Sequence, residues 1–173
     1  DLSDMTGNTF WRVSTFNHPN NGSSVYFLAA RNLYIDENGI AYIFGATDPA
    51  LPVTDPSQPN FVMGVIFLDL ARNPTNPEYL GGWQDYYTND GMVRGDTLWA
   101  ACMGEGKFFG VDVSNKANPT VMGQQASPTG FTNNCWISDN GDYLFVSEEV
   151  SNGYIASYDV TDLSNIVSCF SFS

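Results

Sequence analysis

Short apolar segments and polar turns alternate along this chain in an order that recurs three times. Each unit opens with a short apolar segment, at 33–35, 92–93 and 136–137, followed by a turn containing Asp and Gly. Such turns supply the positive φ angles that tight hairpins need. A second apolar segment then comes at 41–44, 98–101 and 143–146. The pattern therefore predicts an antiparallel hairpin at the start of each unit.

Two further strands complete each unit, and an aspartate marks the passage between them. The third strands are predicted at 63–68, 108–111 and 154–158, and the fourth at 79–83, 120–123 and 167–170. The aspartates are Asp69, Asp112 and Asp159, spaced by 43 and 47 positions. A carboxylate at a strand end can accept hydrogen bonds from the backbone of the following turn. We expect these three residues to have a structural role, because an active site needs only one copy.

Four strands per unit at this spacing are typical of a propeller blade. The second and third strands are almost wholly apolar, as expected of a sheet covered on both faces. No stretch predicts an α-helix. The predicted fold class is all-β, a β-propeller-type repeat of four-stranded antiparallel blades. The ring is incomplete, since propellers close with about 4–8 blades.

The repeats divide the chain into one propeller domain or a segment of one. Residues 1–30 are predicted to end a preceding blade. Complete blades follow at 31–90, with a long loop at 46–61, at 91–133 and at 134–173. An arc of blades leaves apolar faces uncovered at its ends, at 10–16 and at Trp136, Phe145 and Tyr158. The expected partners are therefore proteins, either the remaining blades of a longer parent or identical subunits.

Charge narrows the partners further. The chain has 19 acidic and 6 Lys or Arg residues, a net charge of -13. Nucleic acid and anionic membranes need a basic surface, so the net charge argues against both as partners. The chain contains no run of 18 apolar residues, so the sequence predicts no membrane-spanning helix. The acids permit a divalent cation such as Ca²⁺, although no motif assigns a cofactor or a metal site.

Candidate chemistry is sparse. The single histidine, His18, has no nucleophile signature beside it, so no catalytic residue is predicted. Cys102 and Cys135 are candidates for a disulfide, which leaves Cys169 unpaired. Asn21 is the acceptor in the chain's N-glycosylation motif. The aromatic residues around Trp83 can either stack on a carbohydrate or pack between blades.

Four stretches, 32–42, 65–70, 110–119 and 135–145, resemble the LVIVD-repeat proteins, and more closely the extracellular propellers called choice-of-anchor B. The resemblance covers most of the chain from 32 to 165. It implies a β-propeller that is extracellular or on the cell surface, without an established chemistry. The family carries His at the start of the first strand of several blades, near the central channel. This chain has Arg31, Asn89–Asp90 and Asn133–Asn134 there, which puts any channel site of the family in doubt.

Two functions remain open. The first is a non-enzymatic extracellular β-propeller that serves as a structural, adhesion or assembly module, including assembly into oligomers or filaments. The alternative is a segment of a propeller enzyme, a hydrolase or lyase, with a metal or polar site in the central channel. Only analogy with other propellers supports the alternative, so we favour the first.

Overall fold

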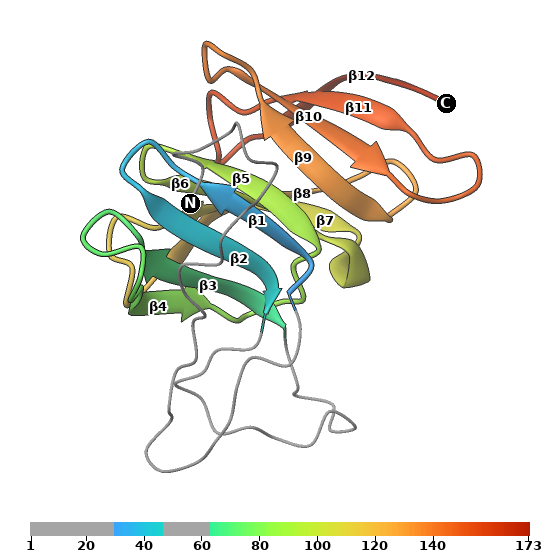
Figure 1. The fold of residues 1–173 in the computed structure, drawn as a ribbon. Coiled ribbons are helices and arrows are strands. Elements are labelled where there is room, and N and C mark those ends of the chain that lie inside the picture. Colours follow the sequence, from blue (N-terminus) through green and yellow to red (C-terminus); the bar gives the residue numbers. More distant parts are fainter. Residues whose placement is uncertain (1–29, 47–62) are drawn as a thin grey trace, which may run out of the picture.

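Three four-stranded antiparallel sheets make up the part of the chain that the computed structural model describes, residues 30–46 and 63–173 (Figure 1). Within each sheet the strands lie in sequence order. Sheet 1 contains β1 (Asn32–Ile35), β2 (Ile40–Ala46), β3 (Gly64–Asp69) and β4 (Glu78–Trp83). Sheet 2 contains β5 (Asp90–Arg94), β6 (Thr97–Cys102), β7 (Lys107–Asp112) and β8 (Thr120–Ala126). Sheet 3 contains β9 (Thr132–Ile137), β10 (Tyr143–Glu148), β11 (Ile155–Asp159) and β12 (Val167–Phe172).

The sheets stack face to face, with sheet 2 between the other two (Figure 1). One turn of 3₁₀ helix, η1 (Met103–Glu105), joins β6 to β7, and the described residues contain no α-helix. The predicted fold class, an open propeller-type repeat of four-stranded blades, is confirmed.

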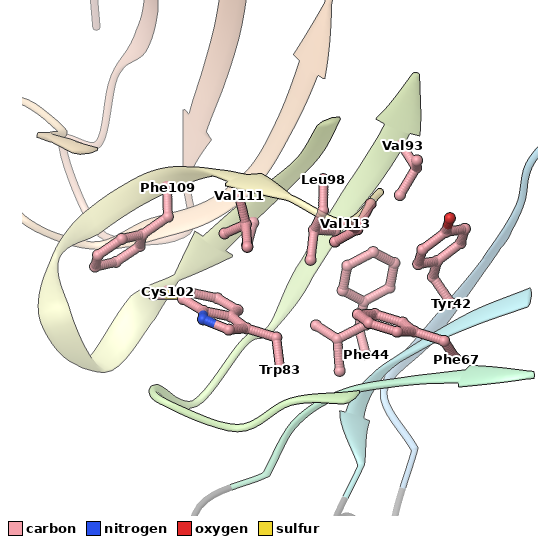
Figure 2. Close-up of a cluster of buried hydrophobic side chains, with 12 residues drawn as sticks. Tyr42, Phe44, Phe67, Trp83, Val93, Leu98, Cys102, Phe109, Val111 and Val113 are labelled. Carbon is pink, nitrogen blue, oxygen red and sulfur yellow. The ribbon is translucent and has the colours of Figure 1, made fainter. Parts of the chain in front are cut away.

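Aromatic side chains fill the space between sheets 1 and 2. Tyr42, Phe44 and Phe67 of sheet 1 pack against side chains of β6 and β7 (Figure 2). Trp83 at the end of β4 is 2% exposed and lies against Phe109, with ring centroids 5.5 Å apart. Burying so much aromatic surface is the main stabilising contribution to the contact between the sheets.

A second cluster joins sheets 2 and 3. Trp99 and Phe108 of sheet 2 meet Leu144, Val146 and Tyr158 of sheet 3. Phe108 and Tyr158 pack edge to face, 4.9 Å apart. The strands β5, β6 and β7 of sheet 2 are therefore covered on both faces, which explains the apolar runs in these strands.

The connection after each third strand is built the same way in every sheet. The backbone N–H just after the aspartate donates to a carbonyl just before the second strand. These bonds are Leu70 to Gly39 at 3.0 Å, Val113 to Asp96 at 2.8 Å and Val160 to Asp142 at 2.9 Å. The residue after each of these aspartates thus ties the end of the third strand to the hairpin of its own blade.

Glycine in the fourth strand lets neighbouring sheets approach closely. Each fourth strand has a register irregularity at the same place, and Gly81 and Gly123 lie beside it in β4 and β8. A Cβ atom on Gly81 would lie 2.1 Å from the carbonyl oxygen of Lys116, and one on Gly123 would lie 2.2 Å from that of Leu163. The segment between the third and fourth strands of the following sheet therefore lies directly against the backbone of the fourth strand.

Candidate functional site

The first strands of the three sheets lie side by side (Figure 1). Polar side chains on or next to these strands form hydrogen bonds from one sheet to the next. The Asn32 amide donates to Asp90 Oδ1 at 2.7 Å, which links β1 to β5. The Asn89 amide donates to Asn133, at 3.0 Å to the backbone oxygen and 2.6 Å to the side-chain oxygen. These residues occupy the places discussed for the family's histidines, and here they join neighbouring sheets.

Arg31 lies just before β1, with its guanidinium 6.0 Å from the centre of the Tyr87 ring. Within residues 30–46 and 63–173, no three His, Cys, Asp or Glu side chains lie close enough together to hold a metal ion. The described part of the first strands therefore offers amides and one carboxylate, but no set of metal ligands.

The recurring aspartates each accept a hydrogen bond from a nearby backbone N–H. The donors are Arg72 to Asp69 at 3.2 Å, Ser114 to Asp112 at 2.8 Å and Thr161 to Asp159 at 3.0 Å. The three carboxylates lie in equivalent places in three different sheets.

Hydrogen bonding also affects the acidity of two of these carboxyls. The backbone N–H of Ser114 holds the pKa of Asp112 below its usual value. The Thr161 hydroxyl, at 2.7 Å, and then its N–H do the same for Asp159.

Asp36 fixes the first hairpin more tightly than its place in a polar turn indicates. Its Oδ1 accepts from the N–H groups of Asn38 and Ile40 at 2.9 and 2.8 Å, and its Oδ2 accepts from the Tyr42 hydroxyl at 3.2 Å. Burial, and next the charge of Asp36, raise the pKa of Tyr42 far above its ordinary range. Spacing along the chain gives no signal that Tyr42 reaches back to this carboxylate.

Glu148 organises the end of sheet 3. Its carboxylate accepts from the Ser127 hydroxyl at 2.7 Å and from the N–H groups of Thr129 and Tyr154 at 2.8 and 3.0 Å. Burial alone would raise the pKa of Glu148, but these hydrogen bonds outweigh it and the pKa is lowered. The adjacent Glu149 is exposed. Glu148 is therefore a structural carboxylate that lies next to the exposed carboxylate of Glu149.

The disulfide considered between Cys102 and Cys135 is not formed, because the three cysteines are free thiols in the structure. Cys102 points into the cluster between sheets 1 and 2, where its sulfur lies 3.6 Å from the Thr88 hydroxyl oxygen. Cys135 points into the other cluster, between sheets 2 and 3. The two side chains lie in different clusters, on opposite sides of sheet 2, so closeness in the repeat order does not produce a bond.

The aromatic residues near Trp83 pack inside the protein and do not form a carbohydrate platform. Trp83 is almost fully buried, and its ring lies 5.9 Å from that of Tyr86. Tyr86 in turn stacks on Phe109 at 4.7 Å. A sugar cannot reach the face of Trp83. Of the two alternatives for these aromatic residues, packing between blades is therefore the one that the structure shows.

Most of the exposed large apolar side chains in the described residues belong to sheet 3. Side chains that point away from sheet 2 are each 41–54% exposed, and we call them the outward face of sheet 3: Trp136, Tyr143, Phe145, Ile155, Val167, Phe170 and Phe172. Trp136 and Phe145 had been expected there. Tyr158 had been expected there too, but it is 2% exposed and packs on Phe108. Tyr158 follows Ser157, the residue in β11 that pairs with Phe145. Because successive residues of a strand point to opposite faces, Tyr158 points toward sheet 2 and Phe145 points away from it.

A shallow hollow of about 190 Å³ lies in this face. Trp136, Phe145 and Ile155 provide apolar walls, and Asn134 and Ser147 provide polar groups. Pockets for small-molecule ligands are larger, at about 300–1,000 Å³. The hollow therefore suits one side chain of a larger partner.

Comparison with known proteins identifies the fold. The chain matches solved structures of Sqt1 from Chaetomium thermophilum, a WD40 β-propeller. One match has a TM-score of 0.56 at 14% identity over 83% of this chain. A second, Sqt1 bound to the N-terminus of the ribosomal protein L10, has a TM-score of 0.54 at 13% identity over 81%. The chain spans about a third of the length of these structures, 35% and 36%. No family model and no curated protein matches the chain.

These matches correct the expected location. The resemblance to choice-of-anchor B proteins implied an extracellular or cell-surface protein, whereas the matching structures are of Sqt1 and one holds part of a ribosomal protein. A ribosomal partner is met inside the cell, so the extracellular expectation is wrong on this comparison. None of the described residues forms a helix long and apolar enough to cross a membrane.

Several predicted features fall outside the described residues. They are His18, the glycosylation acceptor Asn21, the strand expected at 10–16 and most of the long loop at 46–61.

Proposed function

We propose that this chain is part of a non-enzymatic β-propeller that binds another protein, as a scaffold or assembly module. The observation that carries the proposal is the outward face of sheet 3. Seven large apolar side chains, each about half exposed, gather on one sheet. Exposed apolar patches of this kind mark interaction sites on soluble proteins.

The fold likeness supports the same function. The Sqt1 structure bound to the N-terminus of ribosomal protein L10 shows that a propeller of similar blade geometry holds a segment of another protein. Because the identity is only 13%, we carry over the general activity, protein binding, and not that partner. Membership of the LVIVD-repeat proteins is also kept as a prediction, based on the four resembling stretches.

Affinity purification of the full-length protein from its source cells, after chemical cross-linking, tests the proposal. We expect at least one protein to co-purify in a constant ratio, and its cross-links to map to the propeller. A full-length protein that purifies alone, with and without cross-linker, would contradict protein binding. An unrelated acidic protein purified in parallel controls for capture by charge alone.

A further inference from the structure

Central positions of the outward face of sheet 3 are covered in the other two sheets. The strand pairing, counted from the recurring aspartates, gives the equivalent positions in the three sheets. Phe145 in sheet 3 corresponds to Tyr42 in sheet 1 and to Trp99 in sheet 2. Tyr42 and Trp99 are 0% and 5% exposed, against 43% for Phe145. On the fourth strands, Phe172 corresponds to the buried Trp83. Phe145 and Phe172 thus occupy positions that other sheets of this chain keep away from water.

A following blade seated like the others does not fit this face. Gly81 and Gly123 are the fourth-strand residues opposite Phe67 and Gly110, and the next sheet's connection rests on them. The equivalent residue in sheet 3, opposite Ser157, is Phe170. Its ring is half exposed and stacks on Phe172 at 5.8 Å. A backbone connection cannot approach β12 as closely as it approaches β4 and β8, so the occupant of this face differs from blades 2 and 3.

A second copy of the chain is also a poor occupant. The far face of sheet 1, where head-to-tail stacking would place it, already has Ala41, Ile66 and Leu68 buried. Two outward faces of sheet 3 meeting each other would bring like charges together. Residues 117–173 contain six acids and no Lys, Arg or His.

Those acids are placed at both ends of the strands. Asp139, Asp142 and Asp159 lie at one end of the β10–β11 pair, and Glu148 and Glu149 lie at the other. The apolar face lies between the two acidic ends. A complementary partner has an apolar middle and basic ends, since opposite charges steer association and set specificity.

We propose that the outward face of sheet 3 binds a polypeptide segment whose large apolar side chains are flanked by Lys or Arg. One apolar side chain of the segment enters the hollow between Trp136, Phe145 and Ile155. The inference rests on the proposed function and adds to it the place of binding and the chemistry of the partner.

Trp136 provides the readout, because it is 52% exposed on β9, the strand at the inner edge of the face, and lines the hollow, whereas Trp83 and Trp99 are buried. The chain, with Trp11→Phe to remove the tryptophan outside the described residues, is titrated with three synthetic peptides of equal length. The first has Leu and Phe in the middle and Lys at both ends. The second has Glu in place of Lys, and the third has Ser in place of Leu and Phe.

We expect only the first peptide to shift the Trp136 emission to shorter wavelength. The other two should bind at least about tenfold more weakly, because each lacks one half of the complementarity. Raising the salt from about 0.1 M to about 1 M shortens the Debye length from about 10 Å to about 3 Å and should weaken the first peptide several-fold.

Matched variants locate the site. Phe145→Ser removes one wall of the hollow from a half-exposed position and should weaken binding at least about tenfold. Val121→Ser removes a similarly exposed apolar side chain from β8 in sheet 2, and should leave binding unchanged. Circular dichroism of both variants confirms that they are folded.

Three results would overturn the inference. They are equal binding of the Ser-substituted peptide, equal binding by Phe145→Ser, and self-association of the wild-type chain that Phe145→Ser abolishes. If the protein partner found by cross-linking binds Phe145→Ser as well as wild type, protein binding stands and this site is wrong. If no partner is found although the first peptide binds as expected, the proposed function is wrong while the face still has the stated chemistry.

Discussion

Replacing Gly123 by alanine tests whether neighbouring sheets depend on close backbone contact. Gly123 lies in β8, on the side of sheet 2 that faces the connection after β11. An alanine Cβ there would lie 2.2 Å from the carbonyl oxygen of Leu163, whereas ordinary contact begins at 3.4 Å. One of the two backbones must therefore move by about 1 Å, since neither contacting atom belongs to a flexible side chain.

The cost follows from that movement. Overpacking an interior typically costs about 1–3 kcal/mol. The contact is with a backbone carbonyl, so we take the upper end, about 3 kcal/mol, because opening the sheets by about 1 Å also loses dispersion contacts. Alanine reduces the entropy of the unfolded chain, which offsets about 0.4–1 kcal/mol. The net loss in the free energy of unfolding is about 2–3 kcal/mol.

Urea and thermal unfolding, followed by circular dichroism, measure the loss. For a domain of this size each kcal/mol shifts Tm by about 2–4 °C, so Tm should fall by about 5–10 °C. Gly104→Ala is the matched control, because a Cβ atom at Gly104 meets nothing within 4 Å. It makes the same chemical change without the close contact, so it should keep the gain of about 0.4–1 kcal/mol that comes from the unfolded chain.

An unfolding free energy for Gly123→Ala within 0.5 kcal/mol of the Gly104→Ala value would refute the reasoning, since 0.5 kcal/mol is roughly the limit for a neutral surface change. The sheets would then be able to separate without cost. The argument that Phe170 prevents a following blade from seating on sheet 3 would lose its basis as well.

Three further predictions concern single side chains. Asp36→Ala leaves two backbone N–H groups and a tyrosine hydroxyl without their acceptor and should lower the free energy of unfolding by about 1–3 kcal/mol in urea melts. The lowered pKa of Asp159 means that its stabilisation is present above the usual carboxyl pKa and is lost as pH falls through the lowered pKa, so Tm of Asp159→Asn should depend less on pH than wild type below about pH 4. An alkylating reagent at pH 8 should label Cys169 alone in the folded protein, because Cys102 and Cys135 are buried and burial raises the pKa of Cys102 to about 12.

Each of the three has a control and a contrary result. Asp139→Ala removes an exposed carboxylate, and a loss equal to that of Asp36→Ala would show that net charge is responsible. Equal pH dependence of Asp159→Asn and wild type would show that the Thr161 hydrogen bonds do not hold this carboxylate in its charged form. Full labelling of all three thiols without denaturant, at the rate seen in urea, would mean that the clusters around Cys102 and Cys135 are open.

Local signals in the sequence were enough to predict the blades. Turns such as Asn38–Gly39 mark hairpins, because only a few residue types adopt their backbone angles, and the aspartate after each third strand marks the return to the hairpin. The strands and their order within each blade therefore follow from short stretches of the chain. The apolar strands also indicated that blades cover one another.

The tertiary structure decided which way individual side chains point and what meets them. Phe145 and Tyr158 are both aromatic residues in strands of one sheet, yet one is half exposed and the other is buried. Cys102 and Cys135 point into different clusters. Strand periodicity separates the two faces of a sheet but does not say which face has a neighbour, since that depends on how sheets stack.

The place of Phe170 illustrates the same limit most clearly. Its equivalence with Gly81 and Gly123 appears only through strand pairing, because the register shifts once in every fourth strand and the sequences around these positions are not alike. The residue type and the local strand were evident from the chain itself. In the other two sheets, the equivalent position lies against the backbone of the next sheet. This is evident only from contacts between segments about 40 residues apart, such as Gly81 with Lys116 and Gly123 with Leu163.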